Sequence, residues 1–293
     1  MMPSNPFLPG FTARFREIRG TRLRAFEAGS GPTVALVHGL GGAASNWTLM
    51  APALAQRCRV LVPELPGHGG SSPLPAPVET LDPYADRLVA VLDDPAVLVG
   101  HSLGAVVALR AAARHPDAVR GLVLAGCAGI GSGTRQAERA LTLVAFVKPG
   151  KRLSRRRRAV AGKPVLKRVV FGFAGGADPR ALDPRAAEGF LAGSGLYTDT
   201  RTVGDALVRT DPRVELERVR CPALVVHGAR DLQVPLRDAF QYARLLDAPL
   251  RVIADCGHLL NGERPRAVVD AIFGFLHRIG EIEELPLEPE LVR

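Results

Sequence analysis

The residues Gly100-His101-Ser102-Leu103-Gly104 constrain the fold of this chain more than any other segment. The apolar run from Ala96 to Val99 precedes them, and the pattern from Ala105 to His115 is typical of a helix. A strand, a sharp turn and a helix in this order present one serine hydroxyl at the edge of a sheet. The turn strains the serine backbone, so the positions two before and two after Ser102 need glycine. The alternative is an ordinary glycine-bounded turn with a capping serine.

Further along the chain are the two groups that a reactive serine requires. A hydroxyl is a weak nucleophile near neutral pH, so it needs a base to take its proton and an acid to orient that base. The run from Pro222 to Val226 indicates a buried strand that delivers Asp231, the candidate acid, onto the next loop. A second strand-like run, from Leu250 to Ala254, leads to His258, the candidate base. This chain order is typical of a serine turn that is completed by loops after two later strands.

Position along the chain separates His258 from the other six histidines. We expect His101 to point away from the serine and His227 to be buried at a strand end. Two other carboxylates lie close to the candidate acid, Asp238 and Asp255. Asp255 stands three residues before His258 on the same loop, which prevents it from reaching the ring from the required side. The remaining histidines discussed are interpreted as structural or solvated: His68, His115 and His277.

A glycine-rich loop supplies candidate donors for a developing oxyanion. The strand-like run from Thr33 to Val37 is followed by His38-Gly39-Leu40-Gly41-Gly42, whose backbone can approach a substrate closely. The amides of Leu40 and Leu103 are the candidate donors. A phosphate or dinucleotide cradle is the alternative, but the loop has neither G-x-G-x-x-G nor a Gly-Lys-Ser/Thr ending.

These segments together resemble the α/β-hydrolase superfamily, in particular its single-domain members with a lid after the sixth strand. The resemblance covers about residues 30–130 and 215–278. Its nucleophile corresponds to Ser102, its acid to Asp231, its base to His258, and its oxyanion donors to Leu40 and Leu103. The segments that carry the resemblance are the serine turn, the glycine-rich loop with Trp47 downstream, Glu64-Leu65-Pro66-Gly67-His68-Gly69-Gly70-Ser71, His227-Gly228-Ala229-Arg230-Asp231, and Gly257-His258 followed by Glu263-Arg264-Pro265.

The resemblance implies a mostly parallel eight-stranded sheet with helices on both faces, which agrees with the alternation of strand and helix patterns. We expect residues 1–130 and 213–293 to form the core and residues 131–212 to form a helical lid. Four segments of this insertion are apolar enough to pack over the site, namely Leu141–Val147, Val165–Phe173, Phe190-Leu191 and Leu196-Tyr197. We expect Gly39, Trp47 and Leu259 to contact substrate, although packing explains Trp47 and Leu259 equally well.

The resemblance implies hydrolysis of a carboxylic ester or a related acyl bond in a small, largely apolar substrate, through an acyl-enzyme intermediate. Serine at position 102 argues against dehalogenases and epoxide hydrolases, which resemble this plan but carry aspartate there. Hydrolysis of a carbon–carbon bond, acyl transfer to an alcohol and a cofactor-free haloperoxidase-like activity remain open. Outside enzymes, the alternative is a ligand-binding protein on a hydrolase scaffold. We expect no metal and no organic cofactor.

The charge of the chain is concentrated in the insertion. Of the formal net charge of +9, residues 131–212 carry all, with 16 Lys or Arg against 7 Asp or Glu. The segment from Lys148 to Arg168 contains ten basic residues and no acidic one. One interpretation is a weak contact with an anionic membrane surface or an acidic substrate. The other is a solvated face in an arginine-rich protein. Nucleic acid is not expected, since Ser154–Arg158 has no interleaved aromatic residue.

The four cysteines show no close pairing and no metal-ligand spacing, so we interpret them as buried thiols of a cytoplasmic protein. No N-terminal stretch has the features of a secretion signal, and no apolar run approaches 18 residues. The sequence leaves the oligomeric state open.

Overall fold

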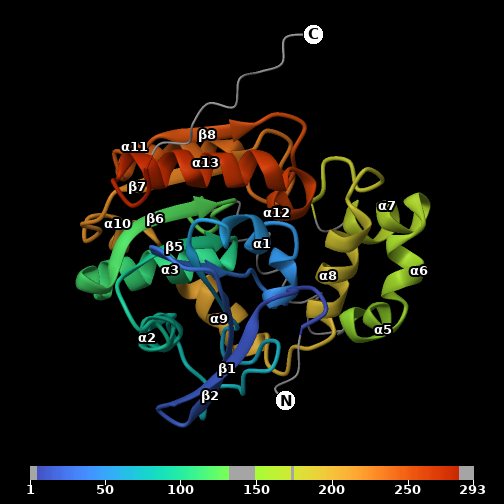
Figure 1. Cartoon of the computed structure of the whole chain (residues 1–293), viewed down its shortest axis with the longest axis horizontal. Helices are drawn as coiled ribbons and strands as arrows, with labels where there is room; N and C mark the ends of the chain where they lie inside the picture. Colours follow the sequence, from blue (N-terminus) through green and yellow to red (C-terminus); the bar gives the residue numbers. More distant parts are fainter. Residues whose placement is uncertain (1–4, 132–148, 173–174, 284–293) are drawn as a thin grey trace.

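The fold is built on one mixed sheet, seen in the computed structural model, which describes residues 5–131, 149–172 and 175–283 (Figure 1). Eight strands of these residues pair in the order β1-β2-β4-β3-β5-β6-β7-β8. The pairs β1–β2 and β2–β4 are antiparallel and all others are parallel, which confirms the predicted fold class. The strands are β1 (Thr12–Ile18), β2 (Thr21–Ala28), β3 (Thr33–Val37), β4 (Arg59–Pro63), β5 (Ala96–His101), β6 (Val119–Ala125), β7 (Ala223–Gly228) and β8 (Leu250–Ile253).

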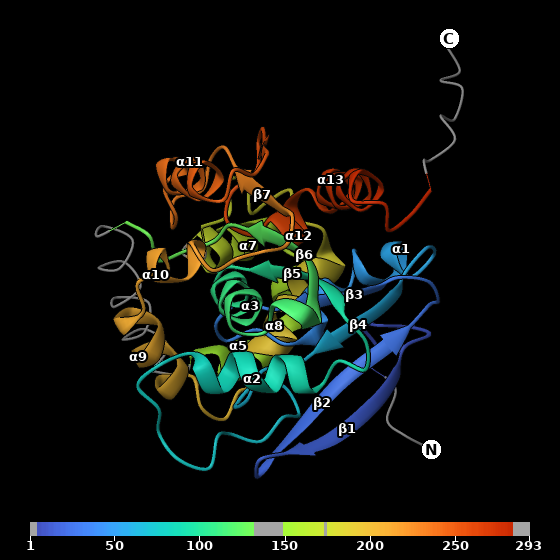
Figure 2. The same ribbon diagram turned by 90° about the vertical axis from the view of Figure 1, so that its left-hand side faces the viewer.

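Helices cover both faces of the sheet, which explains why the central strands are apolar without interruption. Every residue of β3, β5 and β7 is buried, as expected for parallel strands covered on both sides. Figure 2 shows α2, α3 and α11 on one side of the sheet and α1 and α13 on the other. The bounds are α1 (Ala51–Leu54), α2 (Asp82–Ala90), α3 (Leu103–Arg114), α11 (Leu236–Leu245), α12 (Leu260–Glu263) and α13 (Pro265–Arg278), with short 3₁₀ turns η1 (Ala44–Trp47) and η2 (Pro116–Ala118).

Alternate residues of each strand enter two separate cores. In β3, Ala35 and Val37 pack with α2 and α3, whereas Val34 and Leu36 pack with α1 and α13. The period of two is the pleat of a strand, which turns successive side chains to opposite faces. The carboxyl ends of the parallel strands therefore meet at one rigid edge.

A set of helices lies between β6 and β7 in the chain, at the place where the insertion was expected. Figure 1 shows α5 to α8 gathered at one end of the molecule, with α8 between the others and the sheet. These elements are α5 (Pro149–Arg155), α6 (Arg157–Ala161), α7 (Pro164–Gly172), α8 (Pro184–Ser194), α9 (Arg201–Arg209) and α10 (Arg213–Leu216). The apolar segment Leu141–Val147 falls outside the described residues.

The expectation that Val165–Phe173 packs inward as a whole is wrong. Val165 and Val169 expose 68% and 61% of their surface, and only Phe171 and the aliphatic chain of Lys167 are buried among the residues described there. Lys167 lies inside because its Nζ donates a hydrogen bond to a backbone carbonyl of the insertion at 2.6 Å. The apolar residues of α7 are thus divided: Phe171 packs inward, whereas Val165 and Val169 face solvent.

Candidate active site

Ser102 occupies the single residue between β5 and α3, in a backbone conformation that side chains rarely adopt. Its φ is 54° and its ψ is −118°, which strains a residue that carries a Cβ. The Ser102 amide donates to the carbonyl of Ala125 at 3.0 Å, so the turn is tied to the neighbouring strand β6. The side chain is half-buried at the carboxyl edge of the sheet. The predicted strand–turn–helix arrangement around Ser102 is therefore present.

Both glycines of the turn are required by close backbone contacts. A Cβ on Gly100 would lie 2.4 Å from the carbonyl oxygen of Gly104. A Cβ on Gly104 would lie 2.2 Å from the carbonyl oxygen of Val37 in β3. The helix thus begins almost in contact with two strands, and this proximity brings the Leu103 amide close to the loop after β3.

We predict that Gly104→Ala destabilises the protein by about 3 kcal/mol, because backbone atoms cannot move away as a flexible side chain would. Urea unfolding, followed by circular dichroism, measures the change. Gly274→Ala is the matched control: Gly274 lies within α13, and a Cβ there would meet no atom within 4 Å. Alanine at this position is expected to stabilise the helix by about 0.5–1 kcal/mol. Equal effects of the two variants would contradict the close-contact argument.

Asp231 and His258 form a directly bonded pair. Each follows a strand, β7 and β8 respectively, and the His258 Nδ1–H donates to Asp231 Oδ2 at 2.8 Å. The other carboxylate oxygen accepts from the amides of Gln233 and Val234 at 2.8 and 2.9 Å. This bonding leaves the Nε2 of His258 unprotonated and able to accept a proton.

The environment of Asp231 keeps it ionised. Burial alone would raise the pKa of this carboxyl, but the neighbouring His258 ring and the backbone hydrogen bonds outweigh it and hold the pKa below its ordinary value. The two rival carboxylates have other partners. Asp255 is exposed and pairs with Arg230 at 2.7 Å, whereas buried Asp238 accepts from the amide of Gly131 at 3.2 Å.

His101 brings the loop of His258 next to Ser102. The Nε2–H of His101 donates to the backbone carbonyl of His258 at 2.7 Å, and the two rings lie 4.9 Å apart. His101 directly precedes Ser102, so this bond joins the serine turn to the loop after β8. Among the described residues, no hydrogen bond links Ser102 Oγ to His258 Nε2. Hydrogen bonds between a serine and a histidine base are often long in the absence of substrate and tighten when a substrate binds.

The two candidate oxyanion donors have no competing acceptor. Within the described part of the chain, neither the Leu40 nor the Leu103 amide makes a hydrogen bond. Gly39 precedes Leu40 and lies against the serine, since a Cβ on Gly39 would come within 3.3 Å of Ser102 Cβ. Two amides beside the serine are thus available to a ligand.

Two buried histidines, His38 and His68, hold the glycine-rich loop in place, a role that the sequence did not reveal. His68 Nε2 accepts from the Gly41 amide at 3.1 Å while its Nδ1–H donates to the carbonyl of Pro66. His38 Nε2 accepts from the Leu65 amide at 3.1 Å. Each ring needs one bare nitrogen for these bonds, so both must be neutral. The signal in the sequence was only that His68 lies in a turn.

Burial strongly favours the neutral form of three histidines around the site. Desolvation lowers the pKa of His38 to about 4 and the pKa of His68 and His101 to about 3. In the unfolded chain these groups take up protons near pH 6.5. Between pH 6.5 and about 4 the unfolded state therefore binds more protons, so stability falls as the pH is lowered.

We predict that the free energy of unfolding falls by up to about 1.4 kcal/mol per pH unit for each of these histidines across that window. Urea titrations at half-unit intervals of pH measure the slope. His68→Gln, which keeps a donor and an acceptor, should reduce the slope by the contribution of one proton, up to about 1.4 kcal/mol per pH unit. His277→Gln is the control, because His277 is exposed on α13. A slope unchanged by both variants would contradict the prediction.

Glu263 is a second residue that the sequence analysis did not assign. Its carboxylate accepts from the amides of Gly257 and Leu259, on either side of His258, both at 3.1 Å. It also accepts from the amide of Ala177 in the insertion at 2.8 Å. Three amides on one carboxylate fix the backbone of the His258 loop. The only signal in the sequence was the position of Glu263 five residues after His258.

Glu64 anchors the opposite side of the site. It is buried, and its carboxylate accepts from the amide of Ala44 at 3.1 Å and that of Gly70 at 2.7 Å. The Arg24 guanidinium completes its bonding at 2.7 Å. Together with the rings of His38 and His68, this side chain joins the glycine-rich loop and the residues after it to the turn after β4.

The three residues expected to contact substrate occupy different environments. Gly39 is buried beside Ser102, as described above. Leu259 is buried in an apolar cluster with Phe171 and Phe190 of the insertion. Trp47 is only 1% exposed and lies in the core shared with α1 and α13. The environment of Trp47 is therefore that of a packing residue.

Helix α8 covers the site from one loop to the other. Ser45 Oγ donates to the carbonyl of Gly189 at 2.7 Å, which ties α8 to η1 after the glycine-rich loop. At the other side, a Cβ on Gly262 would meet the ring of Phe190 at 2.5 Å. The Gly175 carbonyl, also in the insertion, accepts a hydrogen bond from the His258 amide at 2.8 Å. The helix therefore spans the loops that carry the candidate donors and the candidate base.

Other polar groups near the site are less suited to act as a nucleophile or to bind a metal. Burial raises the pKa of the Cys256 thiol, two residues before His258, to about 12, which makes it a poor nucleophile. Among the described residues, no three His, Cys, Asp or Glu side chains gather in a metal-binding group. No helix in that part of the chain has the length and apolarity needed to span a bilayer.

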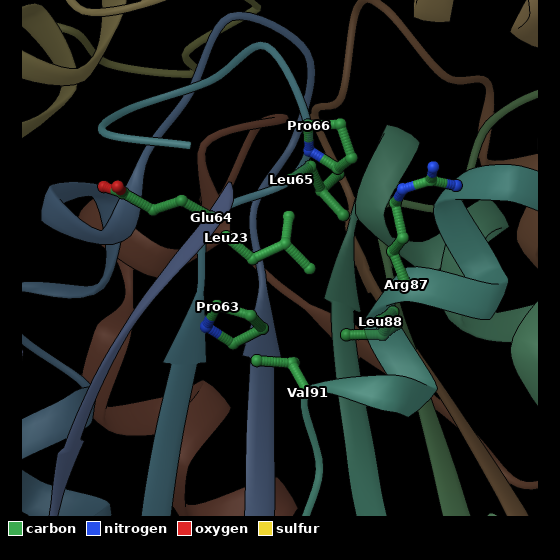
Figure 3. Close-up of a pocket in the computed structure, with 8 residues that line it drawn as sticks. All are labelled: Leu23, Pro63, Glu64, Leu65, Pro66, Arg87, Leu88 and Val91. Carbon is green, nitrogen blue, oxygen red and sulfur yellow. The ribbon is translucent and has the colours of Figure 1, made fainter. Parts of the chain in front are cut away.

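A small pocket away from the serine offers no second site. Figure 3 shows it beside α2, with the Glu64 carboxylate pointing out of it. Arg87, its other charged group, donates to Thr21 Oγ1 at 2.8 Å and to two backbone carbonyls. The lining residues are Leu23, Pro63, Glu64, Leu65, Pro66, Arg87, Leu88 and Val91. Both charged groups are thus fully engaged in structural contacts.

The fold and the strained serine turn define a hydrolase of the α/β class. Comparison with known families places the chain accordingly: it belongs to the alpha/beta hydrolase family, whose model matches residues 34–271.

Individual relatives differ in their reactions. A pimeloyl-[acyl-carrier protein] methyl ester esterase of Aromatoleum aromaticum is 35% identical over 254 residues, 78% of this chain and 91% of that protein. A 2-hydroxymuconate semialdehyde hydrolase of a Pseudomonas species is 29% identical over 272 residues, 88% of this chain and 91% of that protein. The crystal structure of an E-2-(acetamidomethylene)succinate hydrolase has a TM-score of 0.74 at 24% identity and covers 91% of this chain and 99% of its own. The structural likeness supports the fold.

Proposed function

We propose that the protein is a serine hydrolase that cleaves an ester or related acyl bond through an acyl-enzyme intermediate. The observation that carries the proposal is the 2.8 Å bond between His258 and Asp231, on a loop that His101 joins to the serine turn. The bond leaves Nε2 as the free acceptor of the ring. The 35% identity to an esterase supports the same reaction.

The reaction follows from the groups in place. His258 Nε2 takes the proton of Ser102 as the serine oxygen attacks the substrate carbonyl, and Asp231 stabilises the imidazolium that forms. The amides of Leu40 and Leu103 donate to the oxyanion. His258 then gives its proton to the leaving alcohol. Water, activated by the same ring, releases the acyl group and restores the serine.

The substrate we propose is small and largely apolar at its acyl end. We further propose that residues 131–212 act as a lid on a core of residues 1–130 and 213–293. The support is the apolar cluster that Phe190, Leu191 and Leu259 form beside His258. An apolar cover favours an aliphatic acyl group and excludes water, which strengthens hydrogen bonds to the oxyanion.

A fluorophosphonate probe tests the nucleophile directly, because it phosphonylates activated serines only. We expect one adduct, located on Ser102 by peptide mass spectrometry, and no adduct after heat denaturation. The exposed Ser30 provides an internal comparison on the same chain. Folded protein that hydrolyses p-nitrophenyl butyrate without labelling at Ser102 would overturn the assignment. Folded protein with neither activity nor label would favour a ligand-binding protein on this scaffold.

The second candidate function is hydrolysis of a carbon–carbon bond, which the same three residues can support. The 29% identity to 2-hydroxymuconate semialdehyde hydrolase favours it. A panel of aliphatic p-nitrophenyl esters, a thioester and ring-fission dienones separates the two. Faster turnover of a dienone than of every ester would make carbon–carbon bond hydrolysis the preferred function.

A further inference from the structure

The outer face of the insertion carries an exposed aliphatic ridge on α7. Val165, Leu166 and Val169 are exposed, at spacings that place them on one side of the helix. Phe171 and Lys167 occupy the opposite, buried side. The ridge therefore cannot serve the fold of α7 itself, because its packing face is already filled.

The helices α5 to α7 that carry this ridge are rich in cations. Residues 149–172 contain nine Lys or Arg and no Asp or Glu. Glu188 on α8, which packs against α5 and α6, pairs with Arg157 at 3.2 Å and with Arg158 at 3.5 Å. Six further cations of this segment are exposed and make no ion pair among the described residues: Lys151, Arg152, Arg155, Arg156, Lys163 and Arg168.

This pattern contrasts with the arginines around β1. Arg14 pairs with Asp93 at 2.5 Å and Arg59 pairs with the same carboxylate at 2.6 Å. Those cations are paired within the fold, whereas the six exposed cations of α5–α7 have no counterion among the described residues and can attract an external anion. We call the six exposed cations with Val165, Leu166 and Val169 the basic ridge.

We propose that the basic ridge binds the interface of an anionic lipid bilayer. Aliphatic side chains on one helical face flanked by Lys and Arg are suited to the boundary between headgroups and acyl chains. A protein partner would be anchored by aromatic side chains in a pocket. The single aromatic residue of α5–α7 in the described chain, Phe171, is buried.

The position of the basic ridge would bring the candidate active site close to the bilayer. Helix α8 lies between α5–α7 and the sheet (Figure 1), and it covers the loops of the candidate active site. A bilayer held by α7 would therefore lie beside the cover of the site. Apolar esters concentrate in bilayers, so this placement brings substrate close to the enzyme.

Vesicle flotation tests the proposal with the full chain. We expect binding to vesicles of phosphatidylcholine with 30% phosphatidylglycerol, about 100-fold or more above binding to phosphatidylcholine alone, and loss of binding in high salt. A charge variant with Arg155, Arg156, Lys163 and Arg168 changed to Gln should lose this gain. An apolar variant, Val165→Ser with Val169→Ser, should bind about fivefold more weakly than wild type, or weaker still.

A charge-matched control isolates the basic ridge from net charge. It changes four exposed arginines outside the insertion, on α11, β8 and α13, to Gln, and we expect it to bind as wild type: Arg244, Arg251, Arg266 and Arg278. All variants should hydrolyse a soluble ester equally, so this test is independent of the proposed reaction. Equal binding by the charge variant and the control would overturn the proposal. The proposal would also be overturned if the apolar variant bound vesicles as strongly as wild type and the wild-type protein bound poly-glutamate as strongly as vesicles. That result would favour an acidic polymer or protein as the partner.

Discussion

Replacing Ser102 with alanine is expected to lower kcat for ester hydrolysis by about 10⁶ and leave the fold intact. The loss is large because the base, the acid and the oxyanion donors act on one oxygen, and without it none of them has a nucleophile to activate. Alanine also fits the site, since only the hydroxyl is removed from a half-buried position. Initial rates with p-nitrophenyl butyrate, normalised to correctly folded protein, measure the change.

The matched control for this variant is Ser30→Ala, at an exposed position far from the turn in sequence. Its rate should equal that of wild type. A small residual rate in Ser102→Ala can come from a contaminating esterase. Labelling the same preparation with the fluorophosphonate probe measures the amount of that contaminant. A rate within tenfold of wild type in unlabelled, folded Ser102→Ala would show that another group attacks the carbonyl.

Replacing Asp231 with asparagine is expected to lower kcat by about 10⁴. The carboxylate accepts the Nδ1–H of His258 at 2.8 Å and the amides of Gln233 and Val234. An asparagine can keep the backbone bonds with its carbonyl oxygen and then turns its NH₂ towards His258. The ring must accept that bond on Nδ1, so its proton moves to Nε2, the nitrogen that has to receive the serine proton.

Asp255→Asn is the control for this second prediction. Asp255 lies on the same loop as His258, but its carboxylate pairs with Arg230 at the surface, at 2.7 Å. Its activity should stay within about twofold of wild type. The result that would contradict the assignment is equal activity of Asp231→Asn and wild type across pH 6–9, or a greater loss in Asp255→Asn.

The local parts of the site were predictable from the sequence because each follows from short-range backbone chemistry. Gly100 and Gly104 flank Ser102 since a Cβ at either position would collide with backbone atoms. Asp231 and His258 directly follow strand-like apolar runs, which places them at the carboxyl edge of a parallel sheet. The eight-stranded, mostly parallel sheet and the helices on both of its faces also agree with the predicted fold.

The supporting residues were not predictable because their roles depend on contacts between distant segments. Glu263 bonds an amide of the insertion as well as the two amides beside His258. His68 supports a loop 27 residues away in sequence, at Gly41. A pattern of residue types carries no information about which of many polar side chains meets a given amide.

The sequence by itself determined the strained serine turn, the order of the candidate groups and the apolar strands, since these depend on steric limits and hydrophobic periodicity over a few residues. Only the tertiary structure decided that Glu263 bonds the amides on both sides of His258, that three histidines are neutral, and that α7 turns Val165 and Val169 outward. Burial and partner choice are properties of the packed chain: desolvation and hydrogen bonding act between segments that only folding brings into contact.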